Sequence, residues 1–141
     1  MIILDTNVIS EGFRANRHAA VRLWINAQPH QSLYICTPVL AEIRFGIALL
    51  PSGEKRDALQ AGADKLEHDQ YNGRILTFDA RAATAYGRLA AARQQRGRPI
   101  GRMDAFIAAI AVANGADVAT RDVYGFSDLG LNIINPFEFA P

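Results

Sequence analysis

Short apolar segments alternate with helical patterns along the whole chain, and this alternation is the strongest constraint on its fold. Between the apolar segments lie stretches with apolar residues at helical spacing, or with many alanines. Alternating strands and helices favour a parallel sheet with helices on both faces, so we predict an α/β fold. The predicted strands cover residues 2–5, 33–36, 74–78, 117–120 and 132–135.

Capping residues locate the predicted helices. Thr37 is a good N-cap and Pro38 suits the first helical position, so a helix should begin there. Asp79 should cap another helix, and Gly115 should end an apolar one. The predicted helices lie around residues 20–25 and over residues 38–50, 54–68, 80–95 and 103–114.

Length and composition indicate one soluble globular domain over residues 1–141, since 50% of the residues are hydrophobic and 21% are charged. The single cysteine, Cys36, excludes an internal disulfide and suits a reducing compartment. Its apolar neighbours indicate a buried strand thiol. We expect no signal peptide, because the N-terminus lacks a basic region. The longest apolar run, residues 105–113, is too short to cross a bilayer, so we expect a cytoplasmic protein with no membrane contact.

Four acidic residues fall at or near the ends of predicted elements: Asp5, Glu42, Asp104 and Asp122. Taken singly, Asp5 could cap a helix and Glu42 could be an exposed helical residue. Asp104 could complement a helix dipole, and Asp122 could serve a turn. The joint pattern favours a site, because Asp5, Thr120 and Asp122 follow separate strands whose carboxyl ends share one sheet edge. Four acids there would repel one another, so the pattern predicts a hard divalent cation bound by oxygens.

Other polar residues receive simpler interpretations. Asp79 is left out of the site because capping explains it. Three histidines lie in polar segments and are predicted to be surface residues: His18, His30 and His68.

Most of the 15 basic residues are arginines, and several stand close to the acids in sequence. Arg121 adjoins Asp122, and a cluster precedes Asp104 that consists of Arg93, Arg96, Arg98 and Arg102. A solvated helix end explains this cluster when it is taken alone. Beside an acidic metal site, the forked guanidinium group favours contact with a phosphodiester substrate.

Four segments carry a family likeness that runs nearly from end to end. They are residues 3–11 (ILDTNVISE), 37–46 (TPVLAEIRFG), 98–100 with 104–109 (RPI, DAFIAA), and 119–122 with Phe126 and 134–137 (ATRD, INPF). In this order and spacing they resemble the PIN domain and, within it, the VapC-type toxins of bacterial type II toxin–antitoxin systems, with the FitB-like branch most similar. One departure is Gly125, where the family often has an aspartate, while the position of Asp122 varies between Asp and Asn.

The resemblance implies a three-layer α/β/α fold whose five parallel strands lie in the order 3-2-1-4-5. It also implies a Mg²⁺- or Mn²⁺-dependent endoribonuclease that acts as a toxin by cleaving RNA. The implied partners are RNA, a cognate antitoxin and a second copy of the chain in a homodimer. DNA would be reached only through the antitoxin.

Within this reading, Asp5 and Asp104 are the expected direct metal ligands, and Glu42 and Asp122 act through waters or hold a second ion. Three residues are candidates for orienting carboxylates or a water: Thr6, Asn7 and Thr120. Asn7 has helix capping as an equal alternative. Candidates for contact with the RNA backbone are Arg44, Arg98, Arg102 and Arg121.

Two other functions stay open. An aspartyl-nucleophile phosphotransfer domain also begins with a strand and an aspartate, but it requires a second aspartate two residues later, where this chain has Asn7. A non-catalytic PIN-like module that binds a partner would carry the same segments. Metal-dependent RNA cleavage by the purified chain would separate the nuclease from both.

Overall fold

The computed structural model describes residues 1–141 and contains one five-stranded parallel sheet in the order β3-β2-β1-β4-β5. The predicted fold class and strand order are therefore confirmed. The N-terminal strand is the central one, and Leu4 at its end pairs in register with Ala119. The strands are β1 (Ile2–Leu4), β2 (Leu33–Cys36), β3 (Ile75–Leu76), β4 (Asp117–Ala119) and β5 (Ile133–Ile134).

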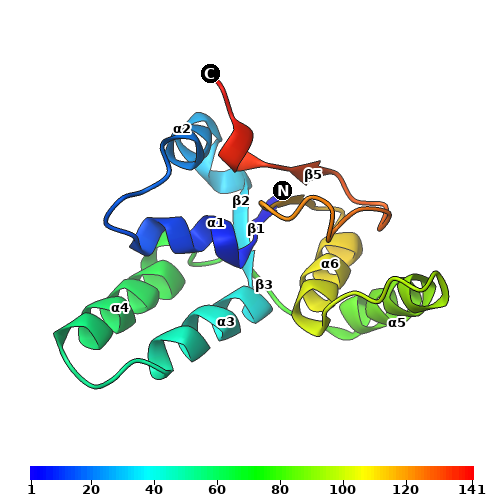
Figure 1. Cartoon of the computed structure of the whole chain (residues 1–141), viewed down its shortest axis with the longest axis horizontal. Helices are drawn as coiled ribbons and strands as arrows, with labels where there is room; N and C mark the ends of the chain where they lie inside the picture. The colour runs from blue at the N-terminus through cyan, green and yellow to red at the C-terminus, as the bar shows by residue number, and fades with distance from the viewer.

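Helices cover both faces of the sheet. Figure 1 shows α1 and α4 on one side of the strands and α5 and α6 on the other. Within these layers, α5 packs along α6, and α3 packs along α4. The helices are α1 (Thr6–Ser10), α2 (Ala19–Ala27), α3 (Thr37–Ala48), α4 (Glu54–Lys65), α5 (Ala80–Gln95) and α6 (Arg102–Asn114). None of them combines the length and the apolar character that a bilayer crossing requires.

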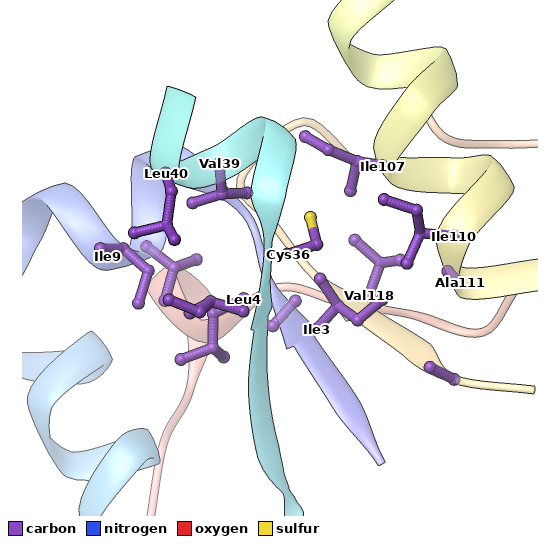
Figure 2. Close-up of a cluster of buried hydrophobic side chains, with 14 of the residues drawn as sticks. Ile3, Leu4, Ile9, Cys36, Val39, Leu40, Ile107, Ile110, Ala111 and Val118 are labelled. Carbon is purple, nitrogen blue, oxygen red and sulfur yellow. The ribbon is translucent and has the colours of Figure 1, made fainter. Parts of the chain in front are cut away.

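The hydrophobic core lies between the sheet and its two helical layers. Neighbouring residues of a strand point to opposite faces, and in Figure 2 Ile3 lies toward Ile110 of α6 while Leu4 lies toward Ile9 of α1. Both strand residues are fully buried. Burial of such a side chain contributes roughly 1.5–3 kcal/mol to folding, so β1 is anchored from both sides.

Cys36 ends β2 inside this core. Burial raises the pKa of its thiol to about 12, so the thiol is neutral at physiological pH. The interpretation of Cys36 as a buried strand residue is confirmed.

Most predicted boundaries agree with the structure. Asp79 caps α5 by accepting a hydrogen bond of 2.9 Å from the Ala82 amide, and Gly115 ends α6 with a left-handed φ of 61°. Thr37 is not the N-cap of α3, because the helix already begins at Thr37 and Cys36 occupies the cap position without a side-chain bond. The third strand is shorter than predicted, since only Ile75 and Leu76 pair with β2.

Candidate active site

Asp5 stands directly after the central strand, where β1 gives way to α1. It is 5% exposed and accepts three hydrogen bonds. The Thr6 amide donates to Oδ1 at 2.8 Å, and Oδ2 accepts from Thr120 Oγ1 at 2.7 Å and from Asn7 Nδ2 at 2.9 Å. Burial raises the pKa of Asp5, and the nearby charge of Glu42 raises it further, while the hydrogen bonds oppose this shift.

Thr120 joins Asp5 to the loop that follows β4. The residue is completely buried, and its hydroxyl accepts hydrogen bonds from Asn7 Nδ2 at 3.2 Å and from the Asp122 amide at 3.0 Å. Asn7 Oδ1 in turn accepts from the Arg121 amide at 3.1 Å. The Asn7 side chain therefore braces Asp5 and Thr120, and its alternative role as a helix cap has no support.

Glu42 and Asp104 approach Asp5 from two different helices. Glu42 Oε1 accepts a hydrogen bond of 2.7 Å from Thr6 Oγ1, which ties α3 to α1. Asp104 lies in the first turn of α6 and is half-buried. Burial, together with the negative charges of Asp5, Glu42 and Asp122, raises the pKa of Asp104 to about 6. The four predicted acids thus act on one another electrostatically.

Asp122 is the exposed member of this acidic group, and its carboxylate folds back onto its own loop. Oδ1 accepts a hydrogen bond of 2.9 Å from the Gly125 amide. A Cβ atom at position 125 would lie 2.2 Å from Oδ2 of Asp122, so this carboxylate position requires the glycine. The departure from the family pattern at Gly125 therefore has a direct structural consequence.

The chemistry of the four acids fits a hard divalent cation. All offered donors are carboxylate oxygens, and the raised pKa values of Asp5 and Asp104 reflect burial and uncompensated negative charge that a cation would relieve. The metal-free carboxylates are more widely spaced than a closed ligand set. The one trio whose ligand atoms all lie within 4.8 Å of one another is elsewhere, at Asp64, Glu67 and His68.

That second trio is organised by an arginine. Arg44 of α3 forms ion pairs of 2.8 Å with Asp64 and 2.7 Å with Glu67, which joins α3 to α4 and to the turn after it. Arg44 already offsets one of the two negative charges, so the trio is a poorer cation site than the acids at the sheet edge. Arg44, a predicted RNA contact, is committed to this network.

The other predicted RNA contacts differ in how far their side chains are already engaged by the protein. Arg98 lies 3.7 Å from the centre of the Tyr124 ring and donates to Ser127 Oγ at 3.0 Å, so it serves the loop structure. Arg121 is exposed and stacks on Phe137 at 3.7 Å, while Arg102 is exposed at the first position of α6. The three histidines are exposed, as predicted.

Sequence reasoning placed Arg93 in a solvated or phosphate-binding cluster, and the structure places it in the interior instead. It is 3% exposed. A signal was present, because Arg93 continues the helical spacing of Ala82, Ala85 and Leu89, which are the buried residues of α5.

Comparison with known proteins extends over the whole chain. The PIN domain matches residues 2–130. The plasmid stability protein StbB of Pseudomonas syringae pv. tomato is 47% identical over 98% of this chain and 99% of that protein. The VapC ribonuclease Y4jK of Sinorhizobium fredii is 45% identical over 99% of this chain and 100% of its own, and the toxin FitB of Neisseria gonorrhoeae is 34% identical over 98% and 99%.

Solved structures share the same fold. The structure of FitAB bound to an IR36 DNA fragment superposes with a TM-score of 0.92 at 33% identity, covering 100% of this chain and 99% of that one. VapBC2 from Rickettsia felis, bound to a DNA fragment from its promoter, superposes with a TM-score of 0.74 at 25% identity and covers 96% and 98%.

Proposed function

The chain belongs to the PIN-domain family, and from this premise we propose that it is a Mg²⁺- or Mn²⁺-dependent endoribonuclease and the toxin of a toxin–antitoxin pair. Residues 1–141 would act as a single nuclease domain. The observation that carries the proposal is the convergence of Asp5, Glu42, Asp104 and Asp122 at the carboxyl edge of the sheet. Burial there, together with the charges of the other three acids, raises the pKa of Asp104 to about 6.

Asp5 and Asp104 would hold the cation directly. When bound, such a cation polarises a phosphate and lowers the pKa of a water molecule. Asp5 is prepared for this role, because Thr120 and Asn7 fix the direction of Oδ2 and the Thr6 amide fixes Oδ1. Fixed ligands lose less conformational entropy when they bind an ion.

Glu42 and Asp122 would hold water molecules at the edge of the same site, or a second ion. Thr6 donates to Oε1 of Glu42, and Gly125 donates to Oδ1 of Asp122. Each carboxylate thus has one oxygen engaged by the protein and one available to accept a proton or a hydrogen bond from water. This arrangement suits the deprotonation of an attacking water.

Arg102 and Arg121 are the arginines that would contact the RNA backbone. Both are exposed and adjoin acids of the site, at the start of α6 and next to Asp122. Binding through arginine–phosphate contacts weakens as salt rises, because bound counterions are released from the nucleic acid. Arg44 and Arg98 would support the fold around the site through the contacts they already make.

A ribonuclease of this kind would need a cognate antitoxin, and the relatives solved as FitAB and VapBC complexes support that partner. A homodimer remains part of the proposal on the family likeness alone. Contact with DNA would be made through the antitoxin. A phosphotransfer role has little support, since Asn7 occupies the place of the second aspartate and braces Asp5.

The deciding experiment incubates the purified chain with total RNA in Mn²⁺ or in EDTA and maps the new RNA ends. Cleavage at defined positions that needs the metal and vanishes in Asp5→Asn supports the proposal. Intact RNA with a folded, metal-loaded wild-type protein favours the non-catalytic partner-binding module.

A further inference from the structure

We propose that Arg93 is a positioning residue for Asp122, and that it acts by holding the loop between β4 and β5 in the conformation seen here. This inference rests on the proposed function, in which Asp122 belongs to the metal-binding edge. No feature of the nuclease reaction itself requires a buried arginine on α5.

Arg93 has an unusual set of partners for a buried cation. It forms no ion pair, and every hydrogen bond that it donates goes to a backbone carbonyl. Nε donates to Arg98 at 3.0 Å, Nη1 to Ser127 at 2.9 Å and Nη2 to Gly125 at 3.1 Å. Burying a charge without an acid is unfavourable, so the forked geometry must serve a need that a smaller apolar residue would not meet.

Gly125 connects this arginine to the acidic edge. Its carbonyl accepts from Arg93, while its amide donates to Oδ1 of Asp122 at 2.9 Å. At the other end, the Asp122 amide donates to Thr120, which itself donates to Asp5. Asp122 is therefore held between the hydroxyl that orients Asp5 and the backbone amide of Gly125, the residue whose carbonyl is bound by Arg93.

The loop is held by the buried Phe126 side chain, by hydrogen bonds within its own turns and by two arginines. Residues 120–132 contain no helix or strand. Asp128 adopts a positive φ of 61°, which an aspartate tolerates but does not favour. Arg98 assists from the same side through Ser127 and the Tyr124 ring. The two arginines thus clamp residues 124–127, and Arg93 is the buried half of the clamp.

A purely structural role for Arg93 would change stability and nothing else. An effect on metal binding or turnover can be told from an effect on stability if Mn²⁺ affinity and kcat are measured on folded protein, well below its melting temperature. Arg93→Lys keeps the positive charge but removes the fork. Gly125→Ala leaves Arg93 in place but introduces a Cβ atom 2.2 Å from the present position of Asp122 Oδ2. Arg88→Lys, on an exposed position of the same helix, is the matched control.

Each variant is made in the wild-type chain and in the Asp122→Ala chain. Mn²⁺ affinity is measured without RNA, from the electron paramagnetic resonance signal of free Mn²⁺. The values of kcat and KM are measured on an RNA substrate. Arg93→Lys and Gly125→Ala should each lower Mn²⁺ affinity or kcat by about 10- to 100-fold, the usual loss when a residue supporting a metal ligand is changed. KM should not change. In the Asp122→Ala background both should have no further effect, because residues acting as one unit are not additive.

Three outcomes would overturn the inference: Arg93→Lys matching the wild type, losses that add to that of Asp122→Ala, or Asp122→Ala retaining full Mn²⁺ affinity and turnover. If Arg93→Lys does not fold, a Gly125→Ala protein with unchanged Mn²⁺ affinity and kcat also overturns it. A wild-type chain that binds Mn²⁺ but cleaves no RNA contradicts the proposed function alone, since the cycle on Mn²⁺ affinity still decides the role of Arg93.

Discussion

The hydroxyl of Thr120 donates a hydrogen bond of 2.7 Å to Oδ2 of Asp5, across a separation of 115 residues. This contact joins the carboxyl ends of β1 and β4, whose register brings Leu4 beside Ala119. The same hydroxyl accepts from the Asn7 side chain and from the Asp122 amide. The Thr120 hydroxyl therefore orients the proposed metal ligand Asp5 and also holds the start of the loop that carries Asp122.

Thr120→Val should damage both stability and activity. The variant keeps the shape of the side chain but leaves buried partners of the hydroxyl unpaired, which lowers the free energy of unfolding by about 1–3 kcal/mol. Loss of an orienting partner should also reduce Mn²⁺ affinity or kcat by about 10- to 100-fold. Urea denaturation and cleavage kinetics measure the two effects. Thr84→Val, on an exposed face of α5, should change kcat little, and equal kinetics for both variants would contradict the role of Thr120.

Removing single charges from the acidic edge should abolish cleavage without unfolding the chain. Asp5→Asn and Glu42→Gln keep shape but remove a carboxylate from the site, and less like-charge repulsion remains in the folded state. Gel assays of metal-dependent RNA cleavage measure the loss. Asp79→Asn should remain fully active, because asparagine is an equally good N-cap for α5. Normal cleavage by Asp5→Asn would rule out this mechanism.

Mn²⁺ should stabilise the folded chain through the acidic edge. A ligand that binds only the folded state contributes about 2.7 kcal/mol at a hundredfold excess over its Kd. Thermal melts in Mn²⁺ should therefore show a higher Tm than melts in EDTA, and Asp104→Asn should remove most of the difference. Asp64→Asn tests the second acidic trio and should leave the Mn²⁺ effect intact. If only Asp64→Asn removes it, the ion binds between α3 and α4 instead.

The metal-free chain should lose stability as the pH rises. The pKa of Asp104 is raised from 3.8 to about 6 in the folded state, so between these values the folded chain binds more protons than the unfolded chain. This contribution is favourable at low pH, declines from about pH 4 and is lost above about pH 6 to 7. The pKa values of Glu11 and Asp79 are lowered from 4.5 and 3.8, so these acids add stability only as the pH rises to about those values, and they contribute little change above about pH 5.

Urea denaturation in EDTA between pH 5 and 7.5 checks this dependence, because Asp104→Asn should flatten the curve. Saturating Mn²⁺ should do the same in the wild type, since a bound cation keeps the carboxylates ionised. A wild-type stability that increases with pH over this interval would contradict the charge arrangement at the sheet edge.

Expression of the chain alone should arrest bacterial growth, and co-expression of a small partner encoded beside it should restore growth. Asp104→Asn should be harmless when expressed alone, because it lacks the proposed ligand. Colony counts after induction and co-purification of the two chains provide the measurement. A soluble wild-type chain that causes no growth defect and captures no partner would favour a PIN-like nuclease with another purpose.

The sequence by itself determined those features that depend on neighbouring residues. Asp79 as a cap and Gly115 as a helix end follow from local propensity, because their partners lie within a few positions. The burial of Cys36 follows from the apolar residues beside it in the sequence. The alternation of strands and helices likewise predicted the parallel sheet, and the family likeness predicted its order. Asp5, Asp104 and Asp122 could be selected because each lies near the end of an element, whereas Glu42 lies in the middle of α3.

Only the tertiary structure decided which side chains meet. The sequence does not distinguish the roles of Arg44, Arg93 and Arg98. In the structure, Arg44 forms ion pairs with α4 and the turn that follows it. Arg93 donates to backbone carbonyls in the interior, and Arg98 stacks on Tyr124. Their destinations depend on packing between segments far apart in the chain, which local spacing does not encode. The contact between Thr120 and Asp5 is of the same kind, because strand register alone brings together two residues that lie 115 positions apart.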